Sequence, residues 1–219
     1  MASDNLAELI NLEANDKSHA ICAQSDLKFV LIIIRDFFRK IFILIIDTVI
    51  KRDSGIYNMT EINELRSFIK FLKDECNFDF NLNVFDRRFR LQKYVFLAKC
   101  FGWHNDYLYG VYLRGPYSSD LATHYYKFKK ININSLPLVE LSTFDKTAFL
   151  NLVNNKDDSW LESATTIISI MDNYRRYYSK DELNKRVLER VFDLKDYIPS
   201  EIIVGAFSDL IDAKILPII

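Results

Sequence analysis

The stretch RRFRLQKYVFLAKCFGWHNDYLYGVYLRGPYSSDLATHYYKFKK, Arg87–Lys130, carries the densest pattern in this 219-residue chain. Its first part repeats apolar residues at helical spacing and stops at Gly102, a residue suited to a left-handed helix end. Residues 107–113 then alternate in the manner of a short strand. A Gly-Pro turn follows at 115–116, and the serine pair at 118–119 is suited to cap a second helix.

Composition favours a mainly helical fold around this stretch. The chain has 5 glycines and 4 prolines, too few for the many turns of a sandwich or a barrel. Its hydrophobic content of 49% is enough for a core, and its net charge of −1 means that any basic surface must be local. We predict a mainly α domain of about eight or nine helices, with a small β element between residues 107 and 141.

The order of these elements is also that of a winged-helix unit, in which the second helix can enter the major groove of DNA. Two short strands that would form its wing are predicted at 131–133 and 138–141, on either side of Pro137. The reading face of the second helix would be Ser118, Ser119, Asp120, Thr123, His124 and Lys127. The residues placed to reach phosphates are Arg87, Arg88 and Arg90. The favoured interpretation is that these charges solvate their helices and complement the helix dipoles.

The N-terminal part, residues 1–55, is predicted to be an arm that precedes a helical domain of residues 56–219. Residues 26–52 read as one amphipathic helix, because its charged residues fall within an arc of roughly 140° on a helical wheel. Its charge-free runs are shorter than the roughly 20 residues of a membrane span. The wide apolar face is expected to pack on its own domain; a second copy or another protein is the alternative, and a membrane is the least favoured.

The sequence contains no recognisable catalytic or metal-binding constellation. Cys22, Cys76 and Cys100 lie far apart and lack zinc-ligand spacing, and the three histidines form no paired motif. Phosphate-binding glycine motifs and the GxSxG nucleophile motif are absent. We therefore expect a protein that is not an enzyme and needs no cofactor or metal. The cysteine usage and the acidic N-terminus, which does not read as a signal peptide, predict a cytoplasmic protein.

The same stretch resembles a known group of proteins. Leu91, Gln92 and Lys93 begin the shared pattern, and it continues through the strand and turn at Tyr112, Gly115, Pro116, Tyr117, Ser118 and Leu121. In these residues the chain is similar to the YwgA-like group of uncharacterised prokaryotic proteins and, more distantly, to the Panacea domain of SocA-like antitoxins. The similarity covers residues 85–130, about a fifth of the chain.

The resemblance implies a non-enzymatic, mostly helical interaction module that acts in a toxin–antitoxin or phage-defence setting. A protein partner is expected to bind through the N-terminal arm or the strand and turn. The candidate partner-binding residues are Phe37, Ile41, Tyr112, Arg114, Pro116 and Tyr117. A winged-helix regulator that binds DNA or RNA is the alternative.

Gln92 is expected to have a structural role rather than a binding role. It lies at the flank of the first helix, where its side-chain amide could bond the backbone of the turn at Gly115–Pro116. Pro116 fixes its own φ and removes a backbone donor, so this turn is expected to be stiff.

Overall fold

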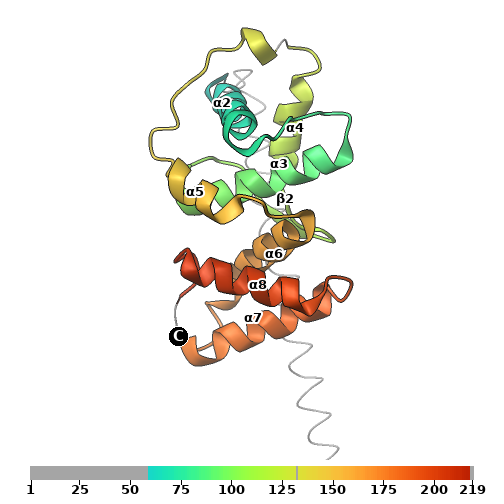
Figure 1. The fold of residues 1–219 in the computed structure, drawn as a ribbon, viewed down its shortest axis with the longest axis vertical. Helices are drawn as coiled ribbons and strands as arrows, with labels where there is room; N and C mark the ends of the chain where they lie inside the picture. The colour runs from blue at the N-terminus through green and yellow to red at the C-terminus, as the bar shows by residue number, and fades with distance from the viewer. Residues whose placement is uncertain (1–58, 132, 218–219) are drawn as a thin grey trace, which may run out of the picture. The chain divides into compact units, whose positions relative to one another are not determined.

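The computed structural model describes residues 59–131 and 133–217, which belong to one compact unit (Figure 1). Seven α-helices and one two-stranded antiparallel sheet in these residues confirm the predicted helical fold with a small β element. The helices are α2 (Met59–Cys76), α3 (Phe85–Ala98), α4 (Ser119–Lys127), α5 (Lys146–Val153), α6 (Asp158–Tyr174), α7 (Lys180–Leu194) and α8 (Ser200–Asp212). The predicted arm of residues 1–55, with Phe37 and Ile41, lies outside the described residues.

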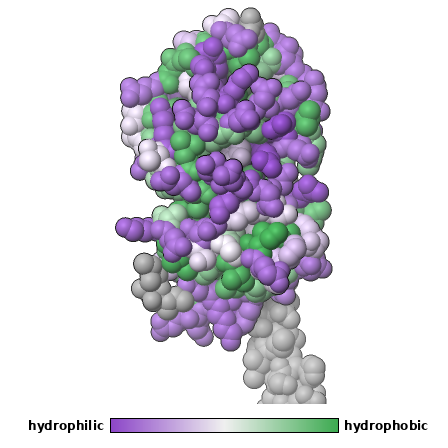
Figure 2. Space-filling model, in the orientation of Figure 1, coloured by the Kyte–Doolittle hydropathy of each residue, from purple (hydrophilic) through white to green (hydrophobic). Residues whose placement is uncertain are grey.

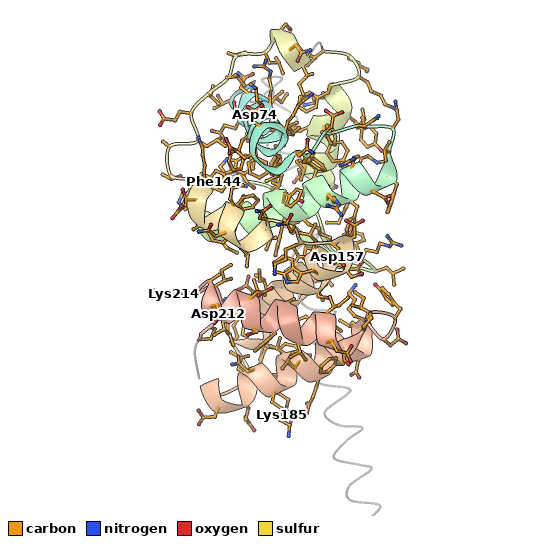
Figure 3. The ribbon with its side chains drawn as sticks, viewed as in Figure 1. Asp74, Phe144, Asp157, Lys185, Asp212 and Lys214 are labelled. Carbon is orange, nitrogen blue, oxygen red and sulfur yellow. The ribbon has the colours of Figure 1, made fainter. Side chains whose placement is uncertain are left out.

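Helix α6 is the element around which much of the unit packs. It contacts α3, α7, α8 and the second strand of the sheet, and Figure 1 shows α7 and α8 beside it. Its start is set by Asp157, whose carboxylate accepts the Trp160 N–H at 2.8 Å (Figure 3). All residues from 160 to 168 are buried, as expected of a helix surrounded by other elements.

A cluster of aromatic rings joins α2 to α5 and to the end of α3. The Phe68 ring centroid lies 4.4 Å from that of Trp103, 5.6 Å from that of Phe144 and 5.8 Å from that of Phe149. Figure 3 labels Phe144 just before α5. Most of these rings are tilted or meet edge to face, which adds about 0.5–1.5 kcal/mol per pair beyond the area they bury.

Helix α3 ends as the sequence predicts. It passes into the 3-10 helix η1 (Lys99–Phe101), and Gly102 closes it with a left-handed φ of 87°. It begins at Phe85, after the N-cap residue Val84, and no side chain caps it. The chain that follows reaches the sheet beside α6.

The sheet is a hairpin formed by β1 (Gly110–Tyr112) and β2 (Gly115–Tyr117). Val111 pairs with Pro116, and Tyr112 pairs with Gly115. Leu113 and Arg114 form the turn between the strands, and Gly115 supplies the left-handed residue, with a φ of 80°. The predicted strand at 107–113 is therefore shorter than expected, and the Gly-Pro pair lies within the second strand instead of ending the first.

The predicted wing after α4 is absent from the described residues of that segment. Residues Ile133–Ser135 form a 3-10 helix, η2, and residues 138–141 have no strand partner. Side chains of α2 bind this backbone instead: Ser67 Oγ accepts the Val139 N–H at 2.8 Å, and Arg66 donates to the Asn134 carbonyl at 3.1 Å. These contacts, together with the donor missing at Pro137, explain why the winged-helix order was wrong for this segment.

Helix α7 begins directly after a serine. Ser179 is its N-cap residue, and its hydroxyl bonds the Glu182 carboxylate at 3.2 Å rather than a backbone N–H. Pro199 is the N-cap residue of α8. The carboxylate of Asp209 in α8 accepts the Trp160 indole N–H at 2.7 Å and ties α8 to α6.

The surface shown in Figure 2 is mixed, with hydrophilic residues prevailing and hydrophobic residues in small separate groups. Among the residues that the structure describes, none of the helices has the length and apolar character needed to cross a bilayer.

Candidate functional site

The turn of the β1–β2 hairpin exposes an unusual amount of apolar side chain. Leu113 is 82% exposed, more than any other large hydrophobic residue in the described part of the chain, and Tyr112 beside it is 60% exposed. Val111 is also exposed. Exposed apolar residues scattered singly need no explanation, whereas three in succession on one turn mark a surface that is suited to binding.

Beneath the turn, a buried lysine of α3 holds its backbone. Lys93 is 2% exposed, and its Nζ donates to the carbonyl of Arg114 and, at 2.9 Å, to the carbonyl of Pro116. Gly115 lies between these two acceptors. A Cβ on Gly115 would come within 3.2 Å of Lys93 Nζ and 2.7 Å of Thr166 Oγ1, so the turn lies directly on α3 and α6.

A second buried lysine reaches the turn from the end of α7. Lys195, also 2% exposed, donates to the Leu113 carbonyl, to the Glu162 carboxylate at 2.7 Å and to the Tyr197 hydroxyl at 3.1 Å. Tyr197 in turn donates to the Glu162 carboxylate. These three acceptors match the three N–H groups of an ammonium group, so Lys195 is fully satisfied as the charged partner of Glu162.

The side chain of Gln92 forms two hydrogen bonds with Ser118, the residue that follows β2. Its amide donates to the Ser118 carbonyl at 2.9 Å, and its carbonyl oxygen accepts the Ser118 N–H at 2.9 Å. The predicted structural role is confirmed, with Ser118 as the partner instead of the Gly115–Pro116 turn. Ser118 is fully buried, and its hydroxyl caps α4 by accepting the Leu121 N–H at 3.2 Å.

The environment of Lys93 lowers its pKa to about 7. Burial is the main cause; Glu162 opposes it, while Lys195 and Arg114 add to it. A neutral amine keeps two N–H groups, and Lys93 has two carbonyl acceptors. The hydrogen bonds to the turn therefore persist when Lys93 loses its proton.

This pKa gives the protein a pH dependence that Lys93→Met should remove. Between pH 7 and pH 10 the unfolded lysine holds a proton that the folded one has released, so stability rises with pH and falls as pH drops toward 7. From pH 6 to 8.5 the wild type should gain about 2 kcal/mol in its free energy of unfolding relative to Lys93→Met. Urea denaturation at both pH values measures the difference; parallel behaviour of the two proteins would show that Lys93 keeps its proton.

Aromatic rings of α3 flank Arg114 at the surface of the turn. Its guanidinium carbon lies 5.5 Å from the Phe85 ring centroid and 5.9 Å from that of Phe89. The guanidinium carbon of Arg88 lies 5.8 Å from the same Phe85 ring, and its Nη1 donates to the Leu82 carbonyl at 2.6 Å. Phe85 is itself exposed, so the ring and both guanidinium groups border the turn.

The predicted partner-binding residues differ in their exposure to solvent. Tyr112 and Arg114 are exposed, and Tyr117 is half-buried with its ring centroid 5.4 Å from that of Tyr112. Pro116 is buried, so it shapes the turn and offers no contact surface. Phe37 and Ile41 lie outside the described residues.

Several of the residues proposed to bind nucleic acid are buried or already have partners within the chain. Arg90 forms an ion pair with Asp158 at 2.5 Å, Ser118 is buried, and Arg87 lies over the Phe78 ring at 5.6 Å. Arg88 is half-buried and donates a hydrogen bond to the Leu82 carbonyl. Ser119 is exposed at the start of α4, and Lys127 is half-buried in the last turn of the same helix. His124 of the predicted reading face contacts the Tyr107 hydroxyl at 3.0 Å.

Three residues under the turn, Glu162, Lys195 and Tyr197, were not singled out from the sequence. Lys195 lies 82 positions from the Leu113 carbonyl that it binds, so no local pattern links them. The available signal was a glutamate in the middle of an otherwise buried helix, α6, which requires a partner. Comparison of the chain with protein-family models, with curated proteins and with solved structures gave no significant match.

Proposed function

We propose that this chain is a non-catalytic protein-interaction module whose recognition element is the β1–β2 hairpin turn. The observation that carries the proposal is an exposed apolar turn, at Tyr112 and Leu113, whose backbone carbonyls are bound from below by two buried lysines. A leucine side chain in contact with water adds nothing to the stability of the fold, so the exposure of Leu113 is better explained by a binding role.

Rigidity supports this proposal as much as exposure does. A loop that must become ordered on binding loses part of its interaction energy to that ordering. Here the carbonyls of Leu113, Arg114 and Pro116 already have donors, and Gln92 holds Ser118 just beyond. Tyrosine and arginine beside the turn are the residue types that most often dominate binding energy at interfaces.

The resemblance to antitoxin-related proteins supplies the expected class of partner. A toxin or a phage-defence protein in the cytoplasm fits a small module that acts by occupying another protein. A nucleic-acid-binding role is the alternative, and it is the weaker one because Arg90 already has an ion-pair partner, Ser118 is buried and Arg88 bonds the Leu82 carbonyl.

Leu113→Asp should abolish partner capture without unfolding the protein. The substitution places a charge at the centre of the proposed contact, whereas Leu113 makes little contact with its own domain. The measurement is affinity capture of the full chain from native cells, with and without nuclease, with mass spectrometry of the bound proteins. Leu138→Asp is the matched control, because Leu138 is also an exposed leucine but lies outside the hairpin.

The proposal requires one stoichiometric protein that survives nuclease, is bound by the wild type and by Leu138→Asp, and is lost with Leu113→Asp. Equal capture by all three proteins would reject the hairpin turn as the recognition element. Loss of the bound proteins on nuclease treatment would favour the nucleic-acid alternative.

A further inference from the structure

The hairpin turn borders two features that together indicate the chemistry of what binds it. One is the pair of guanidinium groups, Arg88 and Arg114, on the Phe85 ring. The other is an open surface pocket of about 490 Å³ that is lined in part by Tyr197. The hydroxyl oxygen of Tyr197 lies 3.4 Å from the Leu113 carbonyl oxygen, so the pocket and the turn adjoin.

The guanidinium groups are held in place without a negative partner. Among the described residues, no carboxylate oxygen lies within 4.0 Å of a nitrogen of Arg88 or Arg114. Arg90 and Lys156, by contrast, have Asp158 and Asp209 as ion-pair partners, each at 2.5 Å. Arg114 is therefore a positioned positive charge that remains open to a carboxylate from another molecule.

Part of the wall of this open pocket is suited to contact an apolar side chain. Phe192, Tyr197, Ile198 and Pro199 contribute to its wall. Its volume is within the range of about 300–1,000 Å³ that is typical of binding pockets. The charged groups at its wall are Lys195, which is satisfied by Glu162, and Asp196. Asp196 disfavours a negative group inside the pocket and so separates the apolar position from the acidic one.

The geometry points to a linear acidic and apolar peptide segment of a partner protein as the occupant of this surface. A carboxylate of the segment binds Arg114, with Arg88 nearby, and a large apolar side chain a few residues away enters the pocket beside Tyr197. The exposed Leu113 adjoins both positions, because it precedes Arg114 and its carbonyl lies beside Tyr197, and it contacts the segment between them. This inference rests on the proposed function and specifies the partner surface that the hairpin turn recognises.

A random 12-residue peptide library displayed on phage and selected on the full-length chain tests the inference. The expected consensus contains Asp or Glu within a few residues of Leu, Phe or Trp. A synthetic consensus peptide should bind Arg114→Gln about tenfold more weakly than wild type, which corresponds to losing about 1.4 kcal/mol. Arg176→Gln, at another exposed arginine, is the control and should bind as wild type does.

Charge reversal separates a direct contact from a structural effect of the substitution. Arg114→Glu should bind a peptide in which lysine replaces the acidic residue better than it binds the original peptide, an outcome that loss of local structure cannot produce. A consensus without acidic residues, or peptide binding unchanged in Arg114→Gln, would overturn the inference. Competition by single-stranded DNA at equal concentration would overturn it in favour of nucleic acid.

The capture experiment distinguishes failure of this inference from failure of the proposed function. If Leu113→Asp loses the cellular partner while Arg114→Gln and Arg114→Glu keep it, the hairpin turn is the recognition element and the acidic segment is rejected. If all of these variants keep the partner, the hairpin turn itself is rejected.

Discussion

Replacing Glu162 with glutamine is expected to lower the free energy of unfolding by about 3–5 kcal/mol. The carboxylate is 5% exposed and is the ion-pair partner of Lys195, which is 2% exposed. The substitution keeps the size and shape of the side chain, so the loss comes from leaving a buried ammonium group without its counter-charge. The Tyr197 hydroxyl keeps an amide oxygen as acceptor in place of a carboxylate, so its hydrogen bond loses the assistance of the negative charge.

A double-mutant cycle identifies the source of this loss. Lys195→Met alone should also be strongly destabilising, because it leaves the Glu162 carboxylate buried and unpaired. Glu162→Leu together with Lys195→Met should recover much of the stability, because an apolar pair of similar volume carries no desolvation penalty. Urea denaturation of the wild type, Glu162→Leu, Lys195→Met and the double variant closes the cycle and gives the coupling energy.

The control for this cycle is an ion pair at the surface. Glu189 on α7 lies 3.9 Å from Lys185 and 3.3 Å from Arg186, and all three side chains are largely in solvent. Glu189→Gln should change the free energy of unfolding by at most about 1 kcal/mol. Comparable losses from Glu162→Gln and Glu189→Gln would mean that the Glu162–Lys195 pair is not buried in solution.

Local sequence patterns predicted the elements that depend on neighbouring residues. The helix stop at Gly102 and the serine cap of α4 each follow from the conformational preference of one residue. Gln92 was predictable as well, because a buried amide beside a turn must find backbone partners.

The elements that were mispredicted depend on contacts between distant parts of the chain. The segment at 133–141 has the alternation of a hairpin. Its backbone instead forms hydrogen bonds with Ser67 and Arg66 of α2, so it does not pair with another strand. In the sequence, Lys195 cannot be distinguished from the many surface lysines. Only the folded structure brings it to Glu162 of α6. Tertiary packing decides such cases, and a single sequence without that packing cannot anticipate them.

A large effect of a backbone change is expected at Gly115. Its φ of 80° costs an L-residue with a side chain roughly 1–2 kcal/mol. A Cβ there would also lie 2.7 Å from Thr166 Oγ1, and relieving such an overlap costs about 1–3 kcal/mol. We therefore expect Gly115→Ala to lower the free energy of unfolding by about 2–5 kcal/mol and to weaken partner capture, because the turn must move off Lys93.

Two further variants test whether the positive φ and the overlap with Thr166 cause this loss. Gly205→Ala in α8 should be neutral or stabilising, by up to about 1 kcal/mol, because Gly205 is exposed in a helix and has no atom within 4 Å of an added Cβ. Adding Thr166→Ala to Gly115→Ala should recover the part of the loss due to overlap and leave the part due to φ. Partial recovery would separate the two costs; equal effects of Gly115→Ala and Gly205→Ala in urea denaturation would contradict the close packing of the turn on α6.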